Sequence, residues 1–121
     1  MIGAYMAVGF ASQTSPKALW STNPVTITFS ESTGIGHVDE FVKCAPKQDN
    51  IVFRTTVSNP AKISLTTSPG GEATCGPAPD AVTVTAHCLV AMCRGTYTGT
   101  VSILQGYTTI PPNLSVTIRV T

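Results

Sequence analysis

The side chains able to carry acid and base chemistry are few, and His37, Asp39 and Glu40 lie within four residues of one another. An imidazole near a carboxylate can move protons during catalysis. No nucleophile motif of the G-x-S-x-G type accompanies this group, and no arrangement of nucleophile, base and orienting side chain is visible in the sequence. We therefore interpret the group as a solvated strand edge and predict that the chain is not an enzyme.

Sites for phosphate, calcium or a cofactor are not indicated either. The segment 33–36, Thr-Gly-Ile-Gly, lacks the third glycine and the following helix of a phosphate-binding loop, so we predict a turn there. Two pairs of residues with side-chain oxygens, Asp49 with Asn50 and Glu72 with Asp80, do not have the spacing of an EF-hand loop. We predict no cofactor and no metal ion.

The four cysteines, Cys44, Cys75, Cys88 and Cys93, are an even number in a small chain of low charge. This usage is typical of an oxidised protein outside the cytoplasm with two disulfides. Three pairings are open, and we favour Cys44 with Cys75 and Cys88 with Cys93, because the second pair would close a short loop. A zinc site is the alternative, but no C-x-x-C knuckle is present and His87 is the one nearby imidazole in sequence.

Length and composition restrict the class of protein further. The 121 residues suit one domain, and a net charge of +1 with 11% charged residues leaves no basic footprint for nucleic acid. No stretch approaches the roughly 18 consecutive apolar residues of a membrane span. Thr occurs 19 times and Ser ten times, and β-branched Thr, Val and Ile favour strands over helices. The composition predicts an all-β domain.

Short runs of alternating apolar and polar residues, separated by turn residues, indicate about seven strands. The cleanest alternation is at 114–120, where every second residue is apolar and shares one face. We predict strands at 24–29, 38–44, 50–57, 61–66, 80–85, 98–104 and 114–120. The Gly- and Pro-rich segment 68–79 is predicted to be a loop that Cys75 ties to the body. We predict an immunoglobulin-like antiparallel β-sandwich over residues 23–121, with a linker at 12–22 and an N-terminal extension strand at 1–11.

The N-terminal segment 1–11 carries no charge and has two faces that are both apolar or small, so something must cover it. Three interpretations remain open: the tail of a secretory signal with a cleavage site at 9–11, a first strand of the domain's own sheet, and a strand supplied to a neighbouring subunit. The side chains on the more apolar face, which would anchor such a strand, are Ile2, Ala4, Met6, Val8 and Phe10.

Three runs near the C-terminus follow a familiar pattern: Val-Thr-Val-Thr at 82–85, the tag Gly-Thr-Tyr-Thr-Gly-Thr-Val at 95–101, and a terminal Val-Thr-Ile-Arg-Val strand at 116–120. Through these runs the chain resembles bacterial immunoglobulin-like modules of the BACON type, with a weaker similarity extending back to residue 23. The resemblance implies the sandwich fold and either carbohydrate or mucin binding or a spacer role at the cell surface. The family's Trp before its Leu-x-Val strand is absent here, which weakens the carbohydrate interpretation.

Three aromatic rings are candidates for stacking on a surface glycan, namely Trp20, Tyr97 and Tyr107. We expect Trp20 to be buried, and we expect the Tyr97 hydroxyl to bond to the backbone at a corner of the sandwich. Asn113, in Asn-Leu-Ser, is a formal glycosylation sequon.

The sequence thus favours a secreted or cell-surface structural subunit that forms a homo-oligomer or pilus-like polymer by β-strand addition of its N-terminal segment to a neighbour. The alternative is a carbohydrate-binding or adhesion module.

Overall fold

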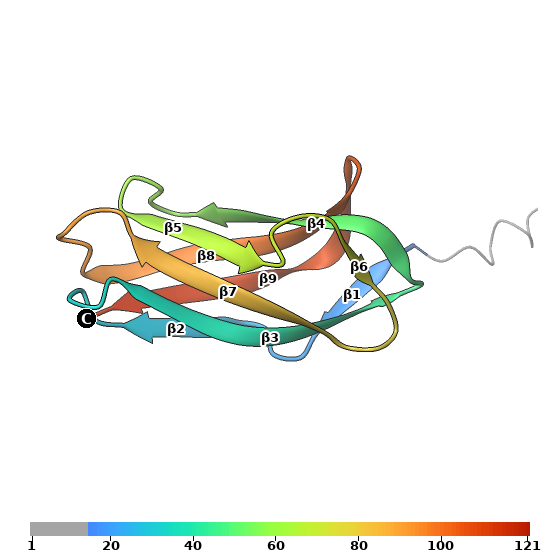
Figure 1. Ribbon diagram of the computed structural model, residues 1–121, viewed down its shortest axis with the longest axis horizontal. Helices are drawn as coiled ribbons and strands as arrows, with labels where there is room; N and C mark the ends of the chain where they lie inside the picture. The colour runs from blue at the N-terminus through green and yellow to red at the C-terminus, as the bar shows by residue number, and fades with distance from the viewer. Residues whose placement is uncertain (1–14) are drawn as a thin grey trace, which may run out of the picture.

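The computed structural model describes residues 15–121, and nine strands in this range form two sheets packed face to face (Figure 1). The four-stranded sheet has the order β1-β3-β7-β5 and the five-stranded sheet the order β2-β9-β8-β4-β6. The strands are β1 (Lys17–Trp20), β2 (Val25–Phe29), β3 (Ile35–Ala45), β4 (Gln48–Val57), β5 (Ile63–Ser68), β6 (Ala73–Cys75), β7 (Asp80–Cys88), β8 (Gly95–Gln105) and β9 (Thr108–Val120).

The predicted all-β sandwich is confirmed, and the strand order is that of immunoglobulin-like sheets. Two details differ from the prediction. The structure has nine strands instead of about seven, and β2 pairs with β9 in parallel, from Val25 opposite Val116 to Phe29 opposite Val120. All other neighbouring strands pair antiparallel.

One of the additional strands, β1, lies inside the predicted linker 12–22, and this part of the prediction is wrong. Ala18 and Trp20 point into the core, whereas Lys17 and Leu19 point outward, and β1 pairs with the end of β3. Four residues between polar segments give too short an alternation to be recognised from sequence. Within the described residues the sandwich therefore includes β1, which lies before residue 23.

The second additional strand, β6, lies in the Gly- and Pro-rich segment 68–79. It has only three residues and occupies the edge of its sheet beside β4, where proline-rich sequence is tolerated. The prediction that Cys75 ties this segment to the body is confirmed, because Cys75 is bonded to Cys44 of β3.

The core lies between the two sheets and is filled by the inward faces of the alternating strands. Over residues 114–120 of β9 the inward residues are the predicted set, with Leu114 and Ile118 fully buried, and the strand also buries Ile110, which lies before the predicted run. The segment 1–14, with the predicted anchor residues Ile2, Ala4, Met6, Val8 and Phe10, lies outside the described residues.

Two disulfides are present, Cys44–Cys75 and Cys88–Cys93, which is the pairing favoured from the sequence. The Cα atoms are 5.3 Å and 5.8 Å apart respectively, within the usual range. The zinc alternative is wrong, because all four sulfur atoms are used in S–S bonds and no thiolate remains to bind a metal.

The two disulfides should contribute unequally to stability. Replacing both Cys44 and Cys75 with Ala removes a cross-link over 31 residues, and we expect a loss of about 3–4 kcal/mol in the free energy of unfolding. The same change at Cys88 and Cys93 opens a loop of only five residues and should cost about 2 kcal/mol. Urea unfolding of both double variants measures this, and equal losses would contradict it.

Gly99 in β8 leaves no room for a side chain, because it lies close to β4 of its own sheet and to β5 of the other sheet. A Cβ atom placed on Gly99 would lie 2.8 Å from the Thr56 carbonyl oxygen and 3.0 Å from the Leu65 Cδ2 atom. We expect Gly99→Ala to lower the free energy of unfolding by about 1–3 kcal/mol through overpacking. Gly71→Ala is the matched control, because an added methyl group there meets no atom within 4 Å. If the two variants unfold at the same urea concentration, the close contact at Gly99 is not as described.

Candidate functional site

The group His37, Asp39 and Glu40 is divided between the two faces of β3. His37 and Asp39 are exposed, as predicted for a solvated edge, and Asp39 accepts a hydrogen bond from the Thr83 hydroxyl at 3.0 Å. Glu40 points inward and is only 2% exposed, which differs from the prediction. The alternation of the strand puts Glu40 on the opposite face from its neighbours, so the structure forms no acid-base pair here.

Glu40 is buried because it holds the loop between β1 and β2. One carboxylate oxygen, Oε1, accepts hydrogen bonds from the Ser21 hydroxyl at 2.9 Å and from the Thr22 backbone N–H at 2.6 Å. Charged acceptors of this kind make strong hydrogen bonds, and buried carboxylates need them. The role of Glu40 is therefore to fix the chain where it crosses from one sheet to the other.

The three aromatic candidates for a glycan surface are not brought together. Trp20 is 5% exposed and lies tilted against Phe53, with ring centroids 6.3 Å apart, and its indole N–H donates to the Pro112 carbonyl at 2.9 Å. Tyr97 is also buried, whereas Tyr107 is fully exposed on the hairpin between β8 and β9. The expected burial of Trp20 is confirmed, and Tyr97 is a core residue as well, so neither of these two candidate rings presents a face to a glycan.

Asn113, the sequon asparagine, is exposed on β9. Its backbone carbonyl accepts a hydrogen bond from the Asn23 side-chain N–H at 3.0 Å. The side-chain oxygen of Asn23, Oδ1, accepts a hydrogen bond from the Ser115 backbone N–H at 3.0 Å. Asn23 therefore joins the turn before β2 to β9. The Asn113 side chain takes no part in either bond.

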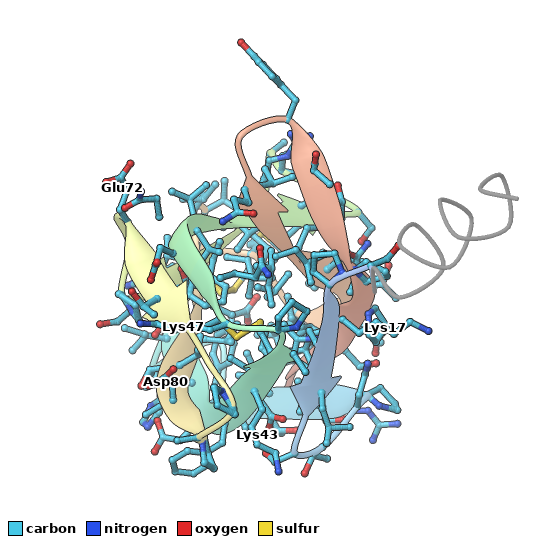
Figure 2. The ribbon with its side chains drawn as sticks, turned by 90° about the vertical axis from the view of Figure 1, so that its right-hand side faces the viewer. Lys17, Lys43, Lys47, Glu72 and Asp80 are labelled. Atoms are coloured by element: carbon cyan, nitrogen blue, oxygen red, sulfur yellow. A yellow bond between two sulfur atoms is a disulfide. The ribbon has the colours of Figure 1, made fainter. Side chains whose placement is uncertain are left out.

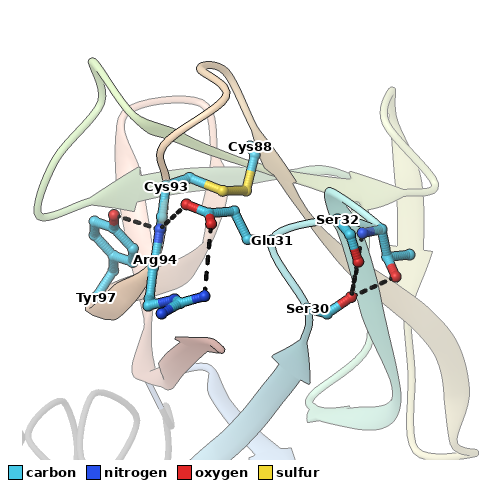
Figure 3. The surroundings of a disulfide bond; sticks show 8 residues. Ser30, Glu31, Ser32, Cys88, Cys93, Arg94 and Tyr97 are labelled. Atoms are coloured by element: carbon cyan, nitrogen blue, oxygen red, sulfur yellow. Dashed lines mark hydrogen bonds and ion pairs between the residues drawn. A yellow bond between two sulfur atoms is a disulfide. The ribbon is translucent and has the colours of Figure 1, made fainter.

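The Cys88–Cys93 loop at one end of the sandwich is held from two sides (Figure 3). The Tyr97 hydroxyl donates to the Cys93 carbonyl at 2.7 Å, which confirms the predicted backbone bond at this corner. Glu31 accepts from the Arg94 backbone N–H at 3.1 Å and pairs with the Arg94 guanidinium at 3.8 Å. The loop presents Leu89, Val90 and Met92 to solvent, with Met92 80% exposed.

A second exposed apolar surface lies at the other end, where β1 begins. Leu19 of β1 and Phe41 of β3 are 62% and 48% exposed on the outer face of the four-stranded sheet. They border a groove of about 600 Å³, which we call the entry groove, lined by Leu19, Trp20, Ser21, Phe41, Lys43 and Pro79. Pockets of this size, about 300–1,000 Å³ and mostly apolar, are typical of binding sites.

The entry groove continues along β1 into a shallower hollow lined by Lys17, Ala45 and Pro77. Figure 2 views the molecule from this end and shows the charged side chains around it, which include Lys17 and Lys43. Both lysines are exposed, and lysine side chains at such positions can lay their aliphatic stems along an apolar surface and keep their ammonium groups in solvent. This groove could not be predicted from the sequence, because Leu19 and Phe41 are brought together only by the pairing of β1 with β3.

Metal and membrane sites have little basis in the described residues. Within residues 15–121 no group of three His, Cys, Asp or Glu side chains is placed to hold a metal ion. In the same range no helix has the length and hydropathy to cross a membrane.

Comparisons with known proteins support the fold and do not identify the function. No family model matches the chain, and no curated protein matches it in sequence. A family 123 glycoside hydrolase from Clostridium perfringens is similar in structure, with a TM-score of 0.54 and 7% identity over 88% of this chain. This chain spans 27% of that hydrolase. The CooA pilin subunit from enterotoxigenic Escherichia coli aligns with a TM-score of 0.45 and 14% identity, over 89% of this chain and 99% of the pilin.

Tyr97 is buried and Tyr107 is exposed, and a comparison of the two tests whether the Tyr97 hydroxyl supports the Cys88–Cys93 loop. Tyr97→Phe removes the hydroxyl that satisfies the Cys93 carbonyl, and we expect the free energy of unfolding to fall by about 1–2 kcal/mol. Tyr107→Phe makes the same chemical change at a fully exposed side chain and should stay within about 0.5 kcal/mol of the parent. Thermal unfolding of the two variants compares them, and equal effects would exclude the Tyr97 bond as a support of the loop.

Proposed function

We propose that this chain is a non-enzymatic structural subunit of an extracellular assembly, and that copies of it join through residues 1–11 by β-strand addition. The sandwich supports a structural role because residues of β1 to β9 fill its core. The two disulfides support an oxidising compartment outside the cytoplasm, because such bonds persist there and are rare in the cytosol.

The observation that carries the proposal is the completeness of the sandwich within residues 15–121. β9 lies between β8 and β2, so the strand that joins these two comes from the same chain. β1 is the edge strand of the other sheet. The uncharged segment 1–11 is therefore not needed as a strand of this core. An apolar segment of that length must be covered elsewhere to avoid aggregation, and a neighbouring copy can provide the cover.

A carbohydrate-binding function has less support. Trp20 and Tyr97 are core residues, and Tyr107 stands by itself on an exposed hairpin, so the three candidate rings form no shared platform. Glycan recognition commonly needs a flat aromatic face that is open to solvent.

The test is to compare the full chain with a version that begins at residue 15. The cut falls before β1, because Ala18 and Trp20 are needed in the core. We expect light scattering and electron microscopy to show polymers of the full chain and monomers of the shortened chain. In the full chain, Val8→Asp should also abolish assembly, because a charge on the apolar face of the segment would have to be desolvated.

The matched control for that substitution is Gln13→Asp, which adds the same charge in the polar connector and should leave assembly intact. If the full chain and the shortened chain are both monomers, the proposed assembly is wrong.

A further inference from the structure

The entry groove needs an occupant that is apolar and nearby. Its wall is formed by Leu19 and Phe41, which are among the large apolar side chains left exposed in residues 15–121. Single exposed apolar residues are ordinary, but a continuous hollow between two strands marks a surface that another segment can fill. The charged atoms at its rim belong to lysine side chains, which can extend away from it.

The described part of the chain begins beside this groove. The hollow that extends the groove starts at Lys17, two residues after Ser15. The fourteen residues before Ser15 include an eleven-residue segment with no charge, which reaches about 36 Å when extended. The length of this segment and its lack of charge suit the groove.

We propose that the entry groove of one copy receives residues 1–11 of a neighbouring copy, with the apolar face of that segment turned toward Leu19 and Phe41. This inference rests on the proposed function, since it names the acceptor surface for the same segment. Edge strand β1 has only four residues, so main-chain pairing along it is short. Side chains entering the groove therefore supply most of the contact.

The Cys88–Cys93 loop of a second copy is another candidate to fill the groove, because it exposes Leu89, Val90 and Met92, but its charges disfavour it. The exposed loop residue Met92 borders a hollow together with Lys62, Arg94 and Glu31, and Glu31 offsets one of these two cations by pairing with Arg94. Docking this loop into the groove would bring those cations toward Lys17 and Lys43. Residues 1–11 carry no charge and meet no such repulsion.

Docking is measured by isothermal titration calorimetry, because the Trp20 ring points into the core and does not report directly on the outer face. A peptide of residues 1–14, with added lysines for solubility, is titrated into the protein that begins at residue 15. We expect a saturable heat of binding. A peptide with Met6→Asp and Val8→Asp should bind at least about tenfold more weakly, as expected for loss of buried anchors.

The groove side is tested in the full chain with Leu19→Asp and Phe41→Asp. Both side chains are on the outer face, so the variants should fold, which circular dichroism checks. We expect both to lose polymer formation and to weaken peptide binding at least about tenfold in the shortened chain. The matched control is Met92→Asp, which adds the same charge at the opposite end and should leave both readouts unchanged.

Each outcome separates this inference from the proposed function. If the full chain polymerises and Leu19→Asp and Phe41→Asp do so equally well, the proposed function stands and the groove is not the acceptor. If Met92→Asp blocks polymers as the groove variants do, the occupant is the loop of a second copy and the inference is wrong. If the full chain is a monomer that does not bind the peptide while the shortened chain does, the segment docks in its own copy, and both proposals fail.

Discussion

The pairing of β9 on both sides, with β8 and with β2, is the constraint on which the rest of the structure depends. β9 supplies Leu114, Val116 and Ile118 to the core and holds the parallel strand β2 in place. Because β9 follows β8 through a tight hairpin, the five-stranded sheet forms from one chain and can pack against the other sheet. The five strands of this sheet all come from residues 25–120 of the one chain.

The fold could be predicted from the sequence where apolar and polar residues alternate over a whole strand. The runs 24–29 and 114–120 have clean inward faces because apolar residues recur at every second position over a whole strand. The short spacing between Cys88 and Cys93 favoured their pairing, and the position of Tyr97 indicated its backbone bond. Each of these signals is local in sequence, so it did not require knowledge of the tertiary structure.

Features that depend on distant partners could not be predicted in the same way. The role of Glu40 depends on Ser21 and Thr22, which lie 19 and 18 residues earlier, and a charged residue on an inward face made the strand's orientation ambiguous. The entry groove depends on the register that sets Leu19 opposite Lys43 and close to Phe41. Strand register across the sandwich is a tertiary property, and alternation within one strand does not contain it.

The parallel pairing of β2 with β9 has a mechanical consequence. β1 begins at one end of the molecule and the C-terminus lies at the opposite end, so tension between the two ends pulls β2 and β9 in opposite directions along their length (Figure 1). The hydrogen bonds from Val25 to Phe29 would then bear the load together in shear, because they are evenly spaced between the strands, and would not open one after another. Resistance to stretching is governed by the rate of unfolding. A strand pair that is loaded in shear is suited to keep that rate low.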